Sequence, residues 1–239
     1  MYLETHSVVF TTLALGDVYR DKVATQIQSV LKFSNHDMYV ITDKPEVFGN
    51  YYDPRIKFID FNGLTDLPLT DKNELFNYNL KMVPIQWVTQ NIRPSITVYM
   101  DADSFLFGNF PDWFSRFFPD NEYGIYGRFR QYLNDNTDNM MNKKIATLGI
   151  DVSSMAVKLP IENIMIFKNG PLLQSFLNKW YEMAKLSYGT GARSDFECIE
   201  MAIAIWESAI PYHHLDNTCP YVDCFRTCHQ NRIHIPFVI

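Results

Sequence analysis

Two aspartates one residue apart, Asp101 and Asp103, are the side chains whose spacing most clearly suggests chemistry. They follow residues 96–100, a short and mostly apolar run that is typical of a strand buried on both faces. Ligands of open α/β sheets bind beyond the carboxyl ends of such strands. Two carboxylates there can hold Mn²⁺ or Mg²⁺ through oxygen, and the cation can hold a diphosphate. The pair therefore predicts metal-dependent transfer in which a nucleoside diphosphate leaves.

Other interpretations share this local pattern. Haloacid-dehalogenase-like phosphatases also place Asp-x-Asp after an apolar strand, but usually with Thr or Val two residues after the second aspartate, where Phe105 stands here. A nucleotidyltransferase needs a Gly-rich basic loop after its first strand, whereas residues 13–17 contain one Gly and no basic residue. A non-catalytic domain that binds sugar nucleotides would also carry the pair, and so would a solvated turn at the end of a strand.

The elements that must position the pair alternate between strand and helix. Up to the aspartates the pattern indicates strands at 8–13, 38–41, 56–61 and 96–100, and helical faces with Val23, Ile27, Val30 and Leu31 and with Leu80, Val83, Trp87 and Val88. Pro84 lies inside the second helical pattern and predicts a kink or a restart there. This order predicts an α/β fold, with a Rossmann-like, mixed and mostly parallel sheet flanked by helices.

The second half of the chain continues with two strands and two helices. The strands are expected at 123–126 and 163–167, and the helical faces carry Leu173, Phe176, Leu177, Trp180 and Ala184, then Phe196, Ile199, Ile203 and Trp206 after a start at Ser194. Residues 128–158 between them are polar and rich in Asn. We interpret this stretch as a mobile lid or an acceptor loop.

The composition is that of a globular protein of 239 residues, 47% hydrophobic, with a formal net charge of −6. The charge argues mildly against nucleic acid as the main partner. We expect no membrane span and no signal peptide, because apolar runs stay far below roughly 20 residues and the N-terminus has no basic region. We therefore expect a cytoplasmic protein whose four cysteines form no disulfide framework.

Four segments resemble the GT-A glycosyltransferases, especially small glycogenin-like and bacterial galactosyltransferase-like members. They are residues 11–19, residues 79–81 with the sequence Asn-Leu-Lys, residues 98–103 with the aspartate pair, and residues 162–167, which begin with Glu-Asn. The order of elements matches over residues 7–215. The resemblance implies one GT-A domain over residues 1–239, with a nucleotide-binding half at 1–104 and an acceptor-binding half at 105–239.

The resemblance also implies an activity. The enzyme would move a sugar from a nucleotide-sugar donor, most of all a UDP-sugar, to a hydroxyl acceptor with the help of Mn²⁺ or Mg²⁺. The glycogenin-like character implies retention of configuration, for which no general base is needed. The acceptor could be a glycan, a protein, a small molecule or DNA, since some bacteriophages glycosylate hydroxymethylated pyrimidines.

Site roles can be carried over position by position from the resemblance. Asp103 would be the main metal ligand, and Asp101 would bind the ribose or share the metal. The backbone of Ala102 would contact the nucleotide, and Lys81 would approach the diphosphate or the sugar. A solvated lysine on a helix is the alternative for Lys81. Other implied contacts are those of Thr12, Leu13, Ala14 and Tyr19 with the nucleotide and of Asn163 with the sugar.

Two acidic residues fall where such enzymes place groups that face the acceptor or the reacting sugar, Asp195 and Glu197. A capping box, with Ser194 at the N-cap and Glu197 three residues on, would explain Glu197 without function. Asp195 in the first turn would also suit the helix dipole.

The third metal ligand is less clear, because the His-containing motif that the family often carries near its C-terminus is absent. His229 and His234 are the nearest candidates, and of these we take His229. A histidine without a metal role is the alternative. Cys219, Cys224 and Cys228 precede His229, but their spacing does not match the paired Cys-x2-Cys of zinc sites.

Overall fold

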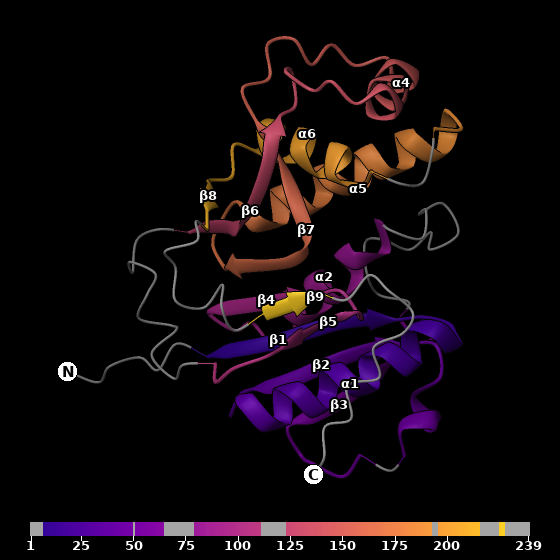
Figure 1. Ribbon diagram of the computed structural model, residues 1–239, viewed down its shortest axis with the longest axis vertical. Helices are drawn as coiled ribbons and strands as arrows, with labels where there is room; N and C mark the ends of the chain where they lie inside the picture. Colours follow the sequence, from indigo (N-terminus) through magenta and orange to yellow (C-terminus); the bar gives the residue numbers. More distant parts are fainter. Residues whose placement is uncertain are drawn as a thin grey trace, which may run out of the picture.

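A computed structural model describes residues 7–49, 51–64, 79–110, 123–192 and 196–215, together with the backbone of 225–227. These residues form a seven-stranded sheet in the order β3-β2-β1-β4-β7-β6-β8 (Figure 1). From one edge to the other the strands are β3 (Ile56–Asp60), β2 (Asp37–Thr42), β1 (Val8–Ala14), β4 (Ile96–Met100), β7 (Lys158–Lys168), β6 (Gly124–Tyr132) and β8 (Tyr212–His214). A second, two-stranded sheet pairs β5 (Ser104–Leu106) with β9 (Phe225–Thr227).

The sheet is mixed and mostly parallel, as the sequence predicts. Strands β3, β2, β1 and β4 all run parallel, and β8 runs parallel to β6. Only β7 breaks the pattern, because it runs antiparallel to both β4 and β6. The parallel half comes from strands that alternate with helices, since a parallel neighbour needs a crossover connection.

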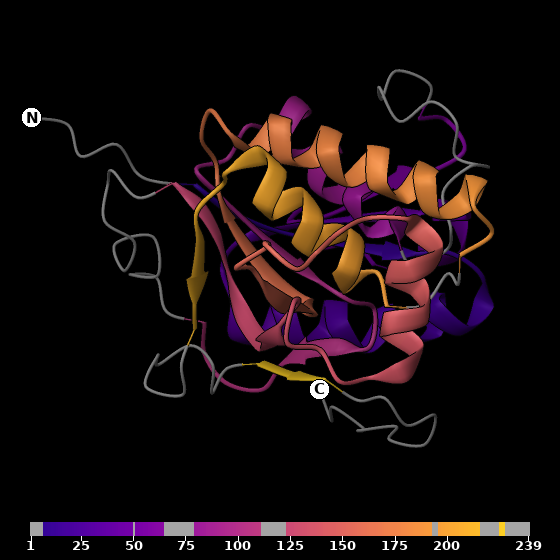
Figure 2. The ribbon, with the colours of Figure 1, turned by 90° about the horizontal axis from the view of Figure 1, so that it is seen from above.

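Helices cover both faces of the sheet. On one face, α1 (Asp17–Phe33) packs through Val23, Ile27 and Val30 against alternate residues of β1, β2 and β4. The other face is covered by α2 (Met82–Asn91), α5 (Leu173–Gly189) and α6 (Cys198–Ser208), with α5 and α6 lying side by side (Figure 2). Because successive strand residues point to opposite faces, each buried strand supplies both cores.

Pro84 does not kink a helix. A short 3₁₀ turn, η2 (Asn79–Lys81), leads into α2, and Pro84 therefore lies in the first turn of α2. The missing N–H of proline would have no partner at that position in any case. The helix thus begins two residues before Pro84 and runs through it, with neither a kink nor a restart at Pro84, and Lys81 immediately precedes the helix. The other 3₁₀ turn of the described residues is η1 (Pro45–Phe48).

The prediction of a loop over residues 128–158 is wrong in part. Strand β6 continues to Tyr132, and α4 (Asn139–Leu148) forms in the middle of the stretch. Asp138 caps α4 by accepting hydrogen bonds from the N–H groups of Met140 and Met141, and Gly149 ends it in a left-handed conformation. The polar composition reflects an exposed face of α4 rather than the absence of structure.

The predicted inward face of α6 is also wrong at one position. Ile199 and Ile203 are fully buried, but Trp206 is 44% exposed. The helix begins at Cys198 rather than near Ser194.

Candidate active site

A cleft of about 540 Å³ opens at the carboxyl ends of β1 and β4. Both aspartates of the Asp-x-Asp pair line it, together with side chains from β1, α1, β6, β7 and the start of α6. The lining residues that carry the argument below are Tyr19, Lys22, Lys81, Asp101, Asp103, Arg130, Glu162, Asn163 and Glu197. The pair therefore lines a cleft at the carboxyl end of β4, where the sequence analysis expects a ligand.

The backbone around Asp101 is held in place from two sides. Its N–H donates to the carbonyl of Asn163 on β7 at 2.8 Å. The side-chain amide of Gln26 on α1 donates to the carbonyls of both Asp101 and Ser104, each at 2.8 Å. The hydroxyl of Tyr99 donates to Asp101 Oδ1, also at 2.8 Å. These contacts fix the direction of the Asp101 carboxylate before any ligand arrives.

Lys81 is buried between two carboxylates. Its Nζ lies 3.1 Å from Asp101 Oδ2 and 2.7 Å from Glu197 Oε1. Burial by itself would lower the pKa of Lys81, but the charges of Asp101 and Glu197 outweigh it and raise the pKa above its ordinary value. Lys81 is therefore a permanent cation in the cleft, and the alternative of a solvated helix lysine is wrong.

Glu197 does not stand at the third position of α6, as the capping box requires. It stands at the N-cap position of α6 with helical φ and ψ, and its side chain makes no capping hydrogen bond. The preceding residue, Phe196, has a φ of +62°, a left-handed conformation that non-glycine residues rarely adopt. The carboxylate of Glu197 instead turns into the cleft toward Lys81. Ser194 and Asp195 lie outside the described residues, and so does the expectation for Asp195.

A buried ion pair contacts the backbone of Phe196, next to Glu197. Lys144 of α4 and Glu200 of α6 lie 2.7 Å apart, Nζ to Oε1, with both side chains fully buried. Lys144 Nζ also donates to the carbonyl of Phe196 at 3.4 Å, and Ser187 Oγ donates to Glu200. Helix α4 is thereby tied to the segment that carries Glu197.

Lys22 is a cleft residue that the sequence analysis missed. Its Nζ lies 3.6 Å from Asp103 Oδ2 and 5.4 Å from the ring centre of Tyr19. Lys22 follows Tyr19 by three residues on α1, so both lie on one face of the helix. That spacing was a readable signal once Tyr19 had been assigned to the nucleotide.

Glu162 is the second missed residue. It lines the cleft, and burial, reinforced by the nearby carboxylate of Glu197, raises its pKa to about 7. The alternation of side chains along a strand could not reveal Glu162, because its neighbour Asn163 also lines the cleft. Only the path of the strand brings both side chains there.

The residues of β1 and α1 that the resemblance assigns to the nucleotide are divided between the cleft and the core. Leu13 and Tyr19 line the cleft, as expected. Thr12 and Ala14 are fully buried, and Ala14 belongs to the core under α1. The carbonyl of Ala14 accepts a hydrogen bond from Thr42 Oγ1 at 2.7 Å. The period of two in β1 decides this division.

Asp101 and Asp103 have the donor chemistry that Mn²⁺ or Mg²⁺ requires, since two carboxylates line one cleft and oxygen ligands suit hard cations. Lys81 forms an ion pair with Asp101, and Lys22 forms one with Asp103. Over the described part of the chain no group of three or more His, Cys, Asp or Glu side chains is placed to share a metal ion. His229 lies outside the described residues, as do Cys219, Cys224 and Cys228.

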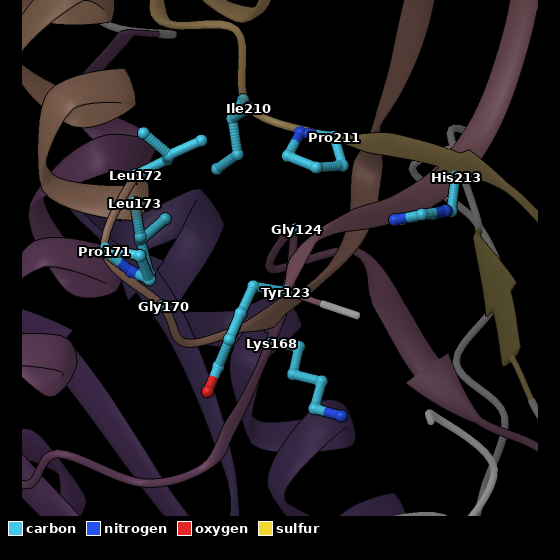
Figure 3. Close-up of a pocket in the computed structure, with 10 residues that line it drawn as sticks. All are labelled: Tyr123, Gly124, Lys168, Gly170, Pro171, Leu172, Leu173, Ile210, Pro211 and His213. Atoms are coloured by element: carbon cyan, nitrogen blue, oxygen red, sulfur yellow. The ribbon is translucent and has the colours of Figure 1, made fainter. Parts of the chain in front are cut away.

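A smaller cavity of about 270 Å³ lies where β6 begins and β7 ends (Figure 3). Leu172 and Leu173 at the start of α5 face Ile210 across it, with Tyr123 and Lys168 nearby. None of the described residues that line it is acidic. It therefore lacks carboxylates that could hold a cation, and the cleft with Asp101 and Asp103 is the candidate active site.

Comparison with known proteins bears on the fold. No protein-family model matches the sequence, and no curated protein matches it. Among solved structures, mouse xyloside xylosyltransferase 1 in its apo form is similar over 88% of this chain and 85% of its own, with a TM-score of 0.53 and 12% identity. The galactosyltransferase LgtC, solved with donor and acceptor sugar analogues, is similar over 87% and 73%, with a TM-score of 0.51 and 10% identity.

The chain has the GT-A fold. At these identities the likeness concerns the fold and does not carry over the substrates of either neighbour. Among the helices that the structure describes, none is long and apolar enough to cross a membrane.

Proposed function

We propose that this protein transfers a sugar from a nucleotide-sugar donor, of the UDP type, to a hydroxyl group. The observation that carries the proposal is the pair Asp101 and Asp103 at the end of β4, lining one cleft with Lys22 and Lys81. Carboxylates for a cation and ammonium groups for phosphate then lie within one cavity, as a diphosphate leaving group requires.

The roles divide along the walls of the cleft. Leu13 and Tyr19 contact the nucleotide, with the backbone of Ala102 beneath it. Asp103 is the main ligand of Mn²⁺ or Mg²⁺, and Asp101 shares the metal or binds the ribose. The metal, when bound, neutralises the charge that develops on the departing diphosphate. Thr12 and Ala14 act from the core, by holding β1 in position.

The remaining side chains serve the diphosphate and the reacting sugar. Lys22 and Lys81 supply positive charge that does not depend on the metal. Glu197 keeps Lys81 oriented through their 2.7 Å ion pair. Asn163 faces the cleft from β7, and its backbone already holds the turn at Asp101. Asp195, which lies outside the described residues, remains a candidate from the resemblance alone.

A phosphatase with Asp101 as nucleophile is less well supported. Phe105 stands where that class usually carries Thr or Val, and Asp101 follows the fourth strand of the chain rather than the first. The hydroxyl acceptor of the proposed reaction is a glycan first, with modified DNA as a second acceptor to be tested.

The decisive experiment combines ligand binding with donor hydrolysis. UDP should raise the melting temperature only with Mn²⁺ or Mg²⁺ present, by a stabilisation of about 2.7 kcal/mol at a hundredfold excess over its Kd. A screen of nucleotide sugars should then find Mn²⁺-dependent hydrolysis of one donor. An equal thermal shift with EDTA would contradict metal-bridged binding, and release of phosphate from phosphomonoesters would favour the phosphatase.

A further inference from the structure

Glu162 is a carboxylate with one oxygen that has no partner. Its side chain lines the cleft, yet Oε2 is buried and has no hydrogen-bond partner among the described residues. Buried polar atoms in folded proteins nearly always have a partner. The side chain as a whole is only partly buried, and its carboxylate has accepting capacity that the described residues do not use, so Glu162 is a candidate for contact with a ligand in the cleft.

The path of β7 explains why Glu162 enters the cleft. From Lys168 to Ile164, β7 pairs with β4, and from Ile161 to Lys158 it pairs with the outer part of β6. The register with β6 shifts between these two stretches, and Glu162 and Asn163 lie at that irregularity. Irregular strand segments re-aim side chains in this way. The carbonyl of Asn163 accepts a hydrogen bond from the N–H of Asp101 at 2.8 Å, so Glu162 is the sequence neighbour of a residue that contacts Asp101.

The charges of the cleft decide what Glu162 can bind. Lys81, a cation of the same cleft whose charge acts on Glu162, is already shared by Asp101 and Glu197. The acidic neighbours would repel a diphosphate from Glu162. A neutral group that donates a hydrogen bond has no such difficulty, and a hydroxyl group is the donor that every sugar and every sugar acceptor carries.

We propose that Glu162 binds the acceptor, through a hydrogen bond that its carboxylate accepts from the hydroxyl group that receives the sugar. The assignment rests on the proposed function. The nucleotide wall comes from β1 and α1, whereas Glu162 comes from β7 with Ile161 beside it and Arg130 of β6 nearby in the lining. The acceptor class that fits this group is a neutral hydroxyl compound such as a sugar.

Hydrolysis of the donor tests this without knowledge of the natural acceptor, because water then takes the place of the acceptor. Water donates a hydrogen bond to Glu162, whereas the azide ion has no hydrogen to donate and is repelled by the carboxylate. The experiment offers both nucleophiles to the nucleotide sugar that the wild type hydrolyses, and measures free sugar against glycosyl azide. This ratio does not depend on how much of the enzyme is folded.

Glu162→Gln should lower hydrolysis about 10- to 100-fold, the range for a hydrogen bond to a charged group. The ratio of glycosyl azide to free sugar should rise by a similar factor. Glu162→Met, which has no accepting oxygen, should show at least as large a change. Glu46→Gln, the same change at an exposed position of η1, is the matched control and should leave both quantities unaltered.

Calorimetry separates the acceptor from the donor sugar. Under the proposal, Glu162→Gln binds UDP and the intact nucleotide sugar, each with Mn²⁺, with Kd values within about twofold of wild type. Loss of one hydrogen bond to a charged group would raise a Kd about tenfold or more. Weakened binding of the nucleotide sugar alone would assign Glu162 to the donor sugar and overturn the proposal. An unchanged azide ratio in both variants would also overturn it. A wild type that hydrolyses no nucleotide sugar would instead overturn the proposed function and this assignment with it.

Discussion

Lys81 and Glu197 form an ion pair of 2.7 Å, with each side chain only 7% exposed, between the start of α2 and the start of α6. Lys81 also lies 3.1 Å from Asp101, so one ammonium group joins the metal motif at the end of β4 to the second half of the chain. Both halves of the cleft therefore depend on one buried cation.

Replacing Lys81 with methionine should destabilise the free protein by about 3 to 5 kcal/mol, because the buried charge of Glu197 and the partly buried charge of Asp101 would both lose this partner. Mn²⁺ should then stabilise Lys81→Met more than it stabilises the wild type, since a dication at Asp101 replaces the lost charge. Thermal unfolding with and without Mn²⁺ measures both effects. An equal Mn²⁺ shift in the two proteins would contradict the idea that the metal and Lys81 act on the same carboxylate.

Replacing Asp103 with asparagine keeps the shape and removes the charge. A neutral amide is a poor ligand for a hard dication, so donor hydrolysis should fall on the order of 10²- to 10³-fold, or roughly 3 to 4 kcal/mol. The fold should survive, because the carboxylate faces a polar cleft. Asp101→Asn should mainly weaken donor binding if Asp101 holds the ribose. Hydrolysis rates and the Kd of UDP for both variants test this, and a fully active Asp103→Asn enzyme would refute the metal assignment.

Lys22→Met should raise the Kd of UDP about tenfold, as expected when one charge-assisted hydrogen bond to phosphate is lost. The dependence of UDP binding on salt should weaken at the same time, because one charge fewer takes part. Lys32→Met, at the far end of α1, is the control and should leave the Kd unchanged. If both variants bind UDP like the wild type, Lys22 has no part in the donor site.

The buried pair of Lys144 and Glu200 predicts a stability effect. Lys144→Met should cost about 3 to 5 kcal/mol, because Glu200 would be left buried and unpaired, and the double variant Lys144→Met/Glu200→Leu should recover most of it. Lys179→Met breaks an exposed pair with Glu182 and should cost about 1 kcal/mol or less. Urea unfolding gives the four free energies. A double variant no more stable than Lys144→Met would show that the loss comes from packing instead.

The raised pKa of Glu162 predicts a pH dependence of stability. Burial raises this pKa from the ordinary 4.5 to about 7, so between those values the folded state binds a proton that the unfolded state releases. Stability from this group is therefore present below about pH 4.5 and is lost as the pH rises to about 7. The difference in unfolding free energy between wild type and Glu162→Gln, measured in urea from pH 4.5 to 8, should fall over that range. A constant difference would mean that Glu162 titrates normally.

The order of the elements could be predicted from the sequence because each depends on local patterns. Buried strands are apolar over four or five residues, and α1 and α5 carry their apolar side chains at helical spacing. The polar composition of residues 128–158 led to the prediction of a loop, because α4 buries only a few side chains and its cap at Asp138 was not recognised. The capping box that the sequence offered for Glu197 was likewise a local interpretation, whereas its carboxylate forms an ion pair with the distant Lys81.

By itself, the sequence determined the α/β sheet and the place of Asp101 and Asp103 at the end of a buried strand, because a strand that is apolar on both faces must lie inside a sheet. Only the tertiary structure decided which side chains surround them. It placed Lys22 beside Asp103 and Lys81 between two carboxylates. It also placed Leu13 in the cleft and Thr12 in the core, and the irregularity of β7 brought Glu162 into the cleft. These contacts join residues far apart in the chain, so their geometry depends on how the strands and helices pack and on no local pattern.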